Sequence, residues 1–184
     1  GDRRGQLYAF QLTVEGKTLK ETAGIFAKAL GVNGDRGAII DLRNTDPEGW
    51  SEDRSPEVKP EQRVIYEMHY RDMTAHASAG SNYPGKYLGM SERGTRSAEG
   101  LATGLDHLVE MGVTHVHLLP TADFGSIDES KPTDQYNWGY EPKNYSAPEG
   151  TYSTDAADPE VRVRELKTLV KAMHDAGLCV VLDV

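Results

Sequence analysis

One stretch of the chain, residues 136–152, combines aromatic rings with amide and carboxylate groups. It opens with Tyr-Asn-Trp-Gly-Tyr-Glu-Pro and closes with Pro-Glu-Gly-Thr-Tyr. Flat aromatic faces stack against the C–H faces of sugars, and oriented amides and carboxylates bind sugar hydroxyl groups. The stretch therefore predicts a site for a polar ligand such as a carbohydrate. The residues alone leave a second interpretation open, in which the rings only pack an ordered loop against the protein.

Two histidines alternate on one apolar segment. His115 and His117 would point to the same side of a strand and could together ligate a metal ion. Histidines that fill a packed face are the favoured interpretation. His69, His107 and His174 show no metal-ligand spacing, and the sequence predicts no cofactor for this chain.

The charge balance and the apolar runs exclude some classes of partner. The chain has 29 acidic and 20 basic residues, a net charge of -9, which argues against nucleic acid or an anionic membrane as the main partner. No apolar run approaches the roughly 20 residues of a membrane span. Cys179 lies in an apolar run and is predicted to be a buried small side chain. Secreted, cell-envelope and cytoplasmic locations all remain open.

The first part of the chain reads as the end of a β-rich unit followed by a connection. Residues 6–16 alternate apolar and polar side chains, which predicts a half-buried antiparallel strand, and residues 38–42 are a second strand candidate. Between them, three glycines at positions 31, 34 and 37 are interpreted as turn glycines, because no helical pattern follows that would support a phosphate-binding loop. Residues 43–62 are polar and contain three prolines, so we place a boundary near residue 60.

Beyond this boundary the pattern changes to alternating strands and helices. Strands are predicted at residues 64–70, 113–119 and 178–184. The last is a near-continuous apolar run of the kind that is buried on both faces of a parallel sheet. The chain stops inside this run, and because an uncovered edge promotes pairing with other chains, we expect further polypeptide or a partner to cover it. The order predicts an α/β fold with a parallel sheet.

Two helices are predicted between these strands. Ser97 can cap the first helix and Gly112 supplies a left-handed stop. Asp158 caps the second, Pro159 occupies its first position and Gly177 follows its end. The buried face of the first helix is predicted to contain Leu101, Leu105 and Leu108. That of the second is predicted to contain Leu166, Leu169, Val170 and Met173.

The connection between Leu119 and Asp158 is unusually long. It supplies well over 20 residues in which no convincing element is predicted, whereas connections in compact α/β units run to about 2–6 residues. Loops of that length tend to be functional. This one carries the aromatic stretch and follows the carboxyl end of a strand, where barrels and open sheets place their ligands.

Residues 136–142 resemble the signature of type I pullulanases within the α-amylase superfamily, glycoside hydrolase family 13. The resemblance continues through Tyr145 and residues 148–150 to residues 180–184, Val-Val-Leu-Asp-Val, which look like the opening of the first conserved region of that superfamily. In the family this region continues to an Asn-His pair. Upstream, residues 66–73 are similar to the first barrel strand of these enzymes.

The amino-terminal part is also covered by the resemblance. Residues 31–34, with Asp41-Leu42 and Gly49-Trp50, are similar to the segment that joins a β-sandwich glycan-binding-type module to the barrel. Two departures are visible. An Asp-Pro-Tyr-like run typical of the family is absent around residues 22–27, and Glu141 stands where Asp is more usual.

The resemblance implies an incomplete (β/α)8 TIM barrel, its first three strands only, preceded by the end of a β-sandwich domain. Residues 1–60 would be the carboxyl-terminal part of that module with a linker, and residues 61–184 the truncated start of the barrel. The implied parent protein is a starch-debranching enzyme that hydrolyses α-1,6-glucosidic linkages in pullulan and related α-glucans with retention. Its implied partners are the α-glucan and the remainder of the barrel, and calcium in the full-length enzyme remains compatible although no ligand set is evident here. The alternative is a non-catalytic α-glucan-binding protein derived from the same fold.

The resemblance also assigns roles to residues of the site. Tyr140 corresponds to the ring that stacks on the sugar at the subsite called minus one. Asn137 and Trp138 either shape the loop or touch sugar. Asp183 matches an acid that helps to hold an active-site arginine supplied later in the chain.

The catalytic carboxylates implied by the resemblance lie on later strands. Retaining glycosidases need two carboxyl groups about 5–5.5 Å apart. Glu67 and Asp72 are five residues apart and would lie on opposite faces of a strand. We therefore expect no catalytic pair in this chain and no activity from it alone. The loop acids, all expected to be solvated, are Asp123, Asp128, Glu129 and Asp134.

Overall fold

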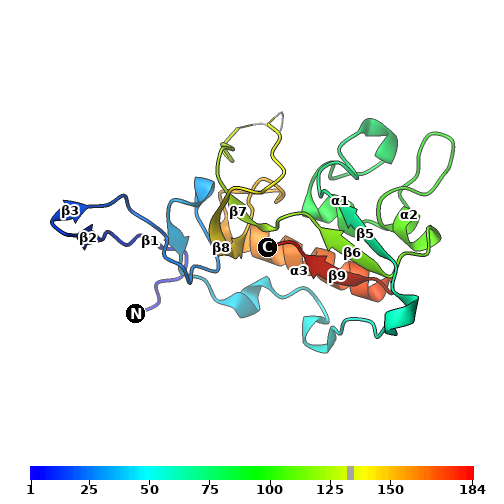
Figure 1. Cartoon of the computed structure of the whole chain (residues 1–184), viewed down its shortest axis with the longest axis horizontal. Helices are drawn as coiled ribbons and strands as arrows, with labels where there is room; N and C mark the ends of the chain where they lie inside the picture. Colours follow the sequence, from blue (N-terminus) through cyan, green and yellow to red (C-terminus); the bar gives the residue numbers. More distant parts are fainter. Residues whose placement is uncertain (132–134) are drawn as a thin grey trace.

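Three parallel strands form the central sheet (Figure 1). The structure, a computed structural model, describes residues 1–131 and 135–184. Strand β6 (His115–Leu118) lies between β5 (Ile65–Met68) and β9 (Cys179–Leu182), and Val116 of β6 stands opposite Tyr66 and Val180. The predicted α/β character and the three predicted strands are confirmed. Within the described residues the sheet is open, with β5 and β9 at its edges.

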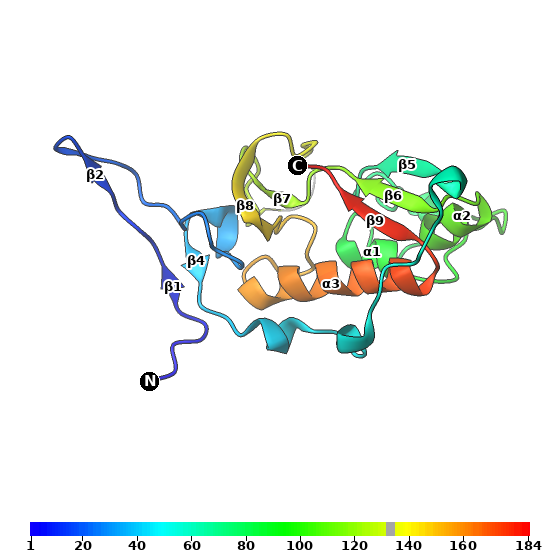
Figure 2. The ribbon, with the colours of Figure 1, turned by 60° about the horizontal axis from the view of Figure 1, so that its bottom comes forward.

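The helix α3 (Pro159–Asp175) lies along one side of this sheet (Figure 2). The side chain of Asp158 accepts a hydrogen bond from the Glu160 N–H, Pro159 occupies the first turn, and Gly177 adopts a φ of 83° just past the end. These local signals are the ones that predicted the helix, and they also define its ends in the structure.

The helix α2 (Gly104–Glu110) begins later than predicted. The Ser97 hydroxyl accepts from the Glu99 N–H, and the Gly100 N–H bonds to the Ser97 carbonyl, so this segment is a turn. Gly100, with a φ of 81°, cannot continue a right-handed helix in that conformation. Leu101 is consequently 68% exposed, and its predicted place on the buried face is wrong, whereas Leu105 is fully buried.

A short helix, α1 (Tyr87–Ser91), was not predicted. It contains two fully buried side chains, Tyr87 and Met90. Gly89 lies between them because a Cβ there would overlap the Tyr83 carbonyl. A five-residue helix interrupted by glycine has too few positions to show a 3.6-residue period.

The long connection contains a small antiparallel sheet, so the expectation that it lacks an element is wrong. Strand β7 (Ala122–Phe124) pairs with β8 (Pro142–Pro148) with register shifts. The two strands are separated by residues 125–141, and no short turn signal joins them, which is why local pattern did not predict the pairing.

The amino-terminal part forms two short antiparallel ladders that extend away from the central sheet (Figures 1 and 2). Strand β1 (Leu7–Tyr8) pairs with β4 (Gly37–Ala38), and β2 (Thr13–Val14) pairs with β3 (Lys17–Thr18). The predicted strand over residues 6–16 is therefore broken into two pieces. Short 3-10 helices occur at Val32–Gly34, Leu42–Thr45, Trp50–Glu52, Pro60–Gln62 and Ala77–Ala79.

The segment predicted as a connection, residues 43–62, packs along α3. Lys167 of α3 lies 5.5 Å from the Trp50 ring centre and forms an ion pair with Asp46. Near the carboxyl end of α3, the His174 Nδ1 lies 2.8 Å from the Asp53 carboxylate. Polar side chains thus fix a segment that has no regular strand or α-helix.

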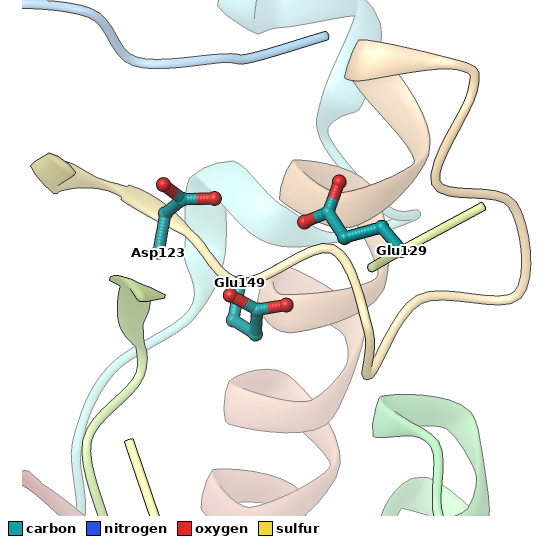
Figure 3. A group of neighbouring side chains, drawn as sticks. All are labelled: Asp123, Glu129 and Glu149. Atoms are coloured by element: carbon teal, nitrogen blue, oxygen red, sulfur yellow. The ribbon is translucent and has the colours of Figure 1, made fainter. Parts of the chain in front are cut away.

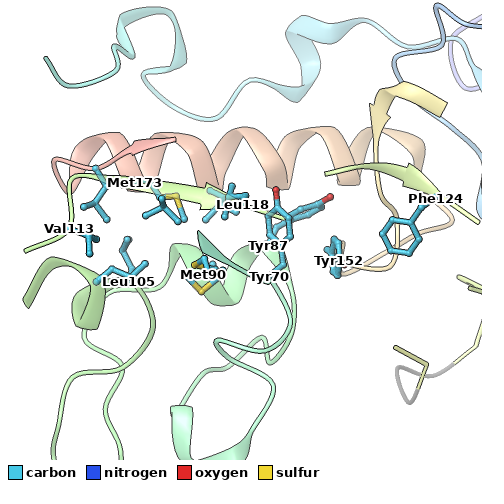
Figure 4. Packing of buried hydrophobic residues seen from close by; sticks show 14 residues of the cluster. Tyr70, Tyr87, Met90, Leu105, Val113, Leu118, Phe124, Tyr152 and Met173 are labelled. Carbon is cyan, nitrogen blue, oxygen red and sulfur yellow. The ribbon is translucent and has the colours of Figure 1, made fainter. Parts of the chain in front are cut away.

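The hydrophobic core fills the space between the sheet and the helices and continues into the long connection (Figure 4). The rings of Tyr70 and Tyr152 stack with centres 4.9 Å apart, and Phe124 of β7 packs against Tyr152. The long connection therefore shares one core with the sheet. Cys179 is buried as predicted. Among the described helices, none is both long and apolar enough to cross a membrane.

Leu101 and Leu105 provide a direct test of where α2 begins. Leu105→Ala should lower the free energy of unfolding by about 2–5 kcal/mol, because it removes a fully buried side chain. Leu101→Ala should change it by less than about 0.5 kcal/mol. Urea unfolding of both variants measures the difference, and equal losses would show that the helix extends back over Leu101.

Candidate functional site

Two of the predicted site residues meet directly. The Tyr140 hydroxyl donates a hydrogen bond of 2.6 Å to Oδ2 of Asp183, which follows strand β9. This hydrogen bond to a carboxylate raises the pKa of Tyr140 to about 12. The phenol therefore keeps its proton over the physiological pH range. The same hydrogen bond connects the long connection to the carboxyl end of the sheet.

A cavity of about 210 Å³ lies beside this pair. Pro120, Gly139, Tyr140, Tyr145 and Asp183 are among its lining residues. Tyr140 is 53% exposed, so its ring is not enclosed in an apolar interior. A larger apolar cavity of about 370 Å³ adjoins it and shares Tyr145 and Asp183. The ring and the carboxylate thus face open space in which a polar ring-shaped ligand can be held.

Asn137 is hydrogen-bonded within the loop, whereas Trp138 is exposed. The Asn137 side chain accepts from the Gly139 N–H at 2.8 Å and donates to the Gly125 carbonyl at 3.3 Å, so it shapes the loop. Trp138 is 59% exposed. Gly139 adopts a φ of 92°, a conformation that favours glycine, and lies against Pro120. The Trp138 indole is therefore exposed to solvent, while the Asn137 side chain fixes the backbone of the loop.

His69 is a further member of the site whose role the sequence did not indicate. Its buried imidazole follows β5, and Nε2 lies 3.0 Å from the Asn137 carbonyl and 3.1 Å from the Tyr152 hydroxyl. A single histidine carries no spacing signal, so only the structure places it beneath the loop.

Three acids of the long connection form a cluster (Figure 3). Oxygen atoms of Asp123, Glu129 and Glu149 lie within 4.8 Å of one another. Asp123 and Glu149 are each 1% exposed, and the Glu129 side chain is 3% exposed. The expectation that loop acids are solvated is thus wrong for Asp123 and Glu129. Asp128 is partly exposed and pairs with Lys131, whereas Asp134 lies outside the described residues.

The fully buried Arg162 of α3 explains why these acids can be buried. Its Nη2 lies 2.8 Å from Oε2 of Glu129, and its Nη1 lies 3.5 Å from Oδ1 of Asp123. Burial raises the pKa of Asp123 to about 6. Burial and the neighbouring Glu129 charge raise that of Glu149 to about 7. Asp123 and Glu149 therefore release their protons at a higher pH than ordinary carboxyl groups do.

The cluster also binds the amino-terminal part of the chain. The Asn33 N–H donates to Glu129 at 2.7 Å, and the Asn33 side chain accepts from the Glu129 N–H at 2.8 Å. The Asn144 amide bridges the Gly34 carbonyl and Asp123. Gly34 has a φ of 66°, and a Cβ there would overlap Asp123. The turn-glycine interpretation is confirmed at this position, where close approach adds a second requirement.

Glu129 and Glu149 already have hydrogen-bond partners within the chain. Backbone N–H groups already bind both carboxylate oxygens of Glu149, from Thr151 at 2.7 Å and from Phe124 at 3.1 Å. The Gly150 N–H binds Glu129 at 3.0 Å. Calcium needs six to eight oxygen ligands at about 2.3–2.6 Å, and a cation placed here would meet the Arg162 guanidinium, which already pairs with Glu129 and Asp123. The positive charge at this place comes from the protein.

The histidines and acids on and just beyond the sheet have separate partners among the described residues. His115 and His117 are half-buried on one side of β6, as predicted, and the nearest acid to His117 in an ion-pair geometry is Glu67 at 3.8 Å. Asp72 instead accepts from the Tyr136 hydroxyl at 2.9 Å. Glu67 and Asp72 thus have different partners.

No family model matches the chain. Comparison with curated proteins, however, finds pullulanases as relatives. Over 184 residues the chain is 42% identical to the pullulanase of Bacillus subtilis (strain 168) and spans 25% of that protein. Over 206 aligned positions it is 31% identical to pullulanase A of Streptococcus pneumoniae serotype 2 (strain D39), again along the whole chain and 16% of the relative. The chain thus spans a quarter or less of these curated relatives.

Solved structures agree with the sequence relatives. The crystal structure of pullulanase from Paenibacillus barengoltzii in complex with maltohexaose and α-cyclodextrin superposes with a TM-score of 0.93 at 47% identity, covering 97% of this chain and 28% of that one. The pullulanase from Bacillus acidopullulyticus superposes with a TM-score of 0.93 at 42% identity, covering 100% and 22%. The resemblance read from residues 136–142 is confirmed.

The acid cluster predicts an unusual dependence of stability on pH. Asp123 and Glu149 have pKa values of about 6 and about 7 in the folded chain, above their ordinary values of 3.8 and 4.5. The folded state therefore binds more protons than the unfolded state in this range, and the free energy of unfolding falls as the pH rises from about 4 to about 8. The fall should be on the order of 1–3 kcal/mol for each group, measured by urea unfolding.

Asp123→Asn tests the origin of this fall. The amide oxygen can still accept from Asn144, while one buried carboxylate is removed, so the variant should lose less stability over the same pH range. Asp128→Asn is the matched control, because Asp128 is partly exposed and outside the cluster, and it should not reduce the fall. Stability that rises from pH 4 to 8 in the wild-type chain would contradict the assignment.

Proposed function

Because this chain is homologous over its whole length to a segment of the pullulanases, we propose that it is part of a starch-debranching glycoside hydrolase. The proposed reaction is hydrolysis of α-1,6-glucosidic linkages in pullulan and related α-glucans, with retention at the anomeric carbon. The observation that carries the proposal is the contact between Tyr140 and Asp183 at the mouth of an open cavity.

In this proposal Tyr140 is the sugar-stacking residue. Its ring is half exposed, and its orientation is fixed because its hydroxyl is held by Asp183. An oriented ring stacks on a sugar with a smaller loss of side-chain entropy than a mobile one. Asp183 has a second oxygen with which to hold an arginine supplied by another part of the protein, in line with the role that the resemblance implies. Trp138, exposed on the same loop, is the further candidate for a sugar contact, and Asn137 supports the loop.

We also propose that the described fold is the start of a (β/α)8 barrel. Support comes from the parallel order of β5, β6 and β9 and from the open edges of their sheet. Residues 61–184 would be this portion of the barrel. Residues 1–60 would be the end of a β-sandwich module and a linker, which fits the short antiparallel ladders that precede β5.

The catalytic acids are proposed to lie elsewhere in the parent protein. A retaining glycosidase needs a nucleophile and an acid/base about 5–5.5 Å apart across the scissile bond. The clustered acids of this chain are buried against Arg162, and Glu67 and Asp72 are held by separate partners. The partners in this proposal are the α-glucan and the remainder of the barrel, and the chain alone is expected to be inactive.

No metal ion is part of the proposal for this chain. Glu129 and Glu149 accept hydrogen bonds from backbone N–H groups, and Arg162 pairs with Glu129 and Asp123 and supplies the compensating charge. A calcium ion in another part of the parent protein is compatible with this arrangement.

Substitutions at Tyr140 test the proposed stacking in the complete polypeptide that carries this chain. Tyr140→Ala should lower kcat/KM for pullulan by about 10–100-fold, because both the ring contact and the bond to Asp183 are lost. Tyr140→Phe keeps the ring and should lose at most about tenfold. Release of reducing ends and maltotriose from pullulan is the measurement. Wild-type protein that binds the glucan without releasing product would instead indicate a non-catalytic glucan-binding protein.

Calcium should not stabilise the acid cluster. Millimolar calcium or a chelator should shift the Tm of the 184-residue chain by less than about 1 °C, whereas a ligand at 100 times its Kd would add about 2.7 kcal/mol. Thermal unfolding followed by circular dichroism measures this. A rise of several degrees that Asp123→Asn abolishes would contradict the proposal and identify the cluster as a cation site.

A further inference from the structure

We propose that His69 is a positioning residue, whose imidazole holds the aromatic loop, residues 136–142, in the shape that brings Tyr140 to Asp183. The inference rests on the proposed function, because it concerns the loop that would bind the glucan. His69 does not line the cavity beside Tyr140, so it would act through the loop backbone and not by touching a ligand.

The hydrogen bonds of His69 fix which ring nitrogen carries the hydrogen. The Arg71 N–H donates to Nδ1 at 3.2 Å, so Nδ1 must present its lone pair. Nε2 then carries the hydrogen and donates to the Asn137 carbonyl, which can only accept, at 3.0 Å. The neutral Nε2–H tautomer satisfies both bonds, and each bond has a direction that an apolar ring cannot supply.

The ring is held in place by its packing. It is buried, and it packs at 84° against the ring of Tyr152, with centres 5.7 Å apart. Tyr152 belongs to the hydrophobic core and is stacked on Tyr70. The imidazole therefore has little freedom, and its bond to the Asn137 carbonyl connects the rigid core to the loop.

The position of Asn137 determines that of Tyr140. The Asn137 side chain accepts from the Gly139 N–H, which makes a tight turn with Gly139 at a φ of 92°. Tyr140 is the next residue, and its hydroxyl reaches Asp183. A displacement of the Asn137 carbonyl would therefore be transmitted through one short turn to the ring that faces the cavity.

A second, weaker attachment lies at the start of the loop. The Tyr136 hydroxyl donates to Asp72 at 2.9 Å, and the Tyr136 ring packs at 5.2 Å from the His69 ring. Asp72 is more than half exposed, and its other oxygen lies 3.7 Å from Nδ1 of His69. Because exposed polar contacts contribute little, the buried bond of His69 should dominate the placement of the loop.

The test compares His69→Gln, His69→Asn and His69→Phe in the complete polypeptide. Glutamine places an amide N–H near the position of Nε2, asparagine ends near that of Nδ1, and phenylalanine keeps only the ring. His69→Gln should retain kcat/KM for pullulan within about threefold of wild type, whereas the other two should lose about tenfold or more. Asp72→Asn, which keeps an acceptor for Tyr136, is the control and should behave like His69→Gln.

Hydrogen exchange followed by mass spectrometry separates the role of His69 from the proposed function. Without any glucan, peptides covering residues 136–142 should exchange about tenfold faster in His69→Asn and His69→Phe, and at wild-type rates in His69→Gln. Peptides covering β6 and β9 should be unchanged in all three. Equal loss of activity in the Gln and Asn variants, or faster exchange throughout the chain, would overturn the proposal. Wild-type protein that neither binds nor cleaves pullulan would contradict the proposed function, while the exchange pattern would still decide whether His69 holds the loop.

Discussion

The placement of the long connection depends on the ion pairs of the buried Arg162 guanidinium with Asp123 and Glu129. The guanidinium lies among three carboxylates from both ends of that connection, and two of them hold raised pKa values because they have left water. Removing one partner of such a group leaves an uncompensated buried charge, which is strongly destabilising. The Glu129 carboxylate also binds Asn33, and Asn144 links Asp123 to Gly34. One polar network thus joins α3, the β7–β8 pair and the amino-terminal part.

Because the polar network fixes both ends of the long connection, a few further contacts are enough to fix the position of the aromatic loop. His69 forms a hydrogen bond to the Asn137 carbonyl of the loop backbone, and Asp183, just beyond β9, accepts a hydrogen bond from the Tyr140 hydroxyl. The first contact comes from the residue just beyond β5 and the second from the residue just beyond β9, so the loop spans the carboxyl edge of the sheet. This is the edge at which α/β folds place ligands. Residues of the aromatic loop, of β8 and of the segment just beyond β9 line the cavity beside Tyr140.

Elements with strong local signals could be predicted from the sequence, and contacts between distant segments could not. Asp158, Pro159 and Gly177 determine both ends of α3, and three apolar runs became the three parallel strands. The start of α2 was predicted too early because the spacing of Leu101 matched a helix that the turn at Gly100 prevents. The β7–β8 pair, the acid cluster and His69 gave no signal, since their partners lie far away in the sequence. Tyr140 and Asp183 were named through the resemblance of their motifs, and only the structure brings them together.

The central claim is that Tyr140, held by Asp183, forms the floor of a glucan site. A crystal structure of the complete polypeptide with bound maltotriose tests it most directly. We predict a glucose ring stacked on the face of Tyr140, with the hydroxyl of Tyr140 still bonded to Asp183. Maltotriose bound well away from residues 136–142, with the Tyr140 ring free of sugar, would contradict it.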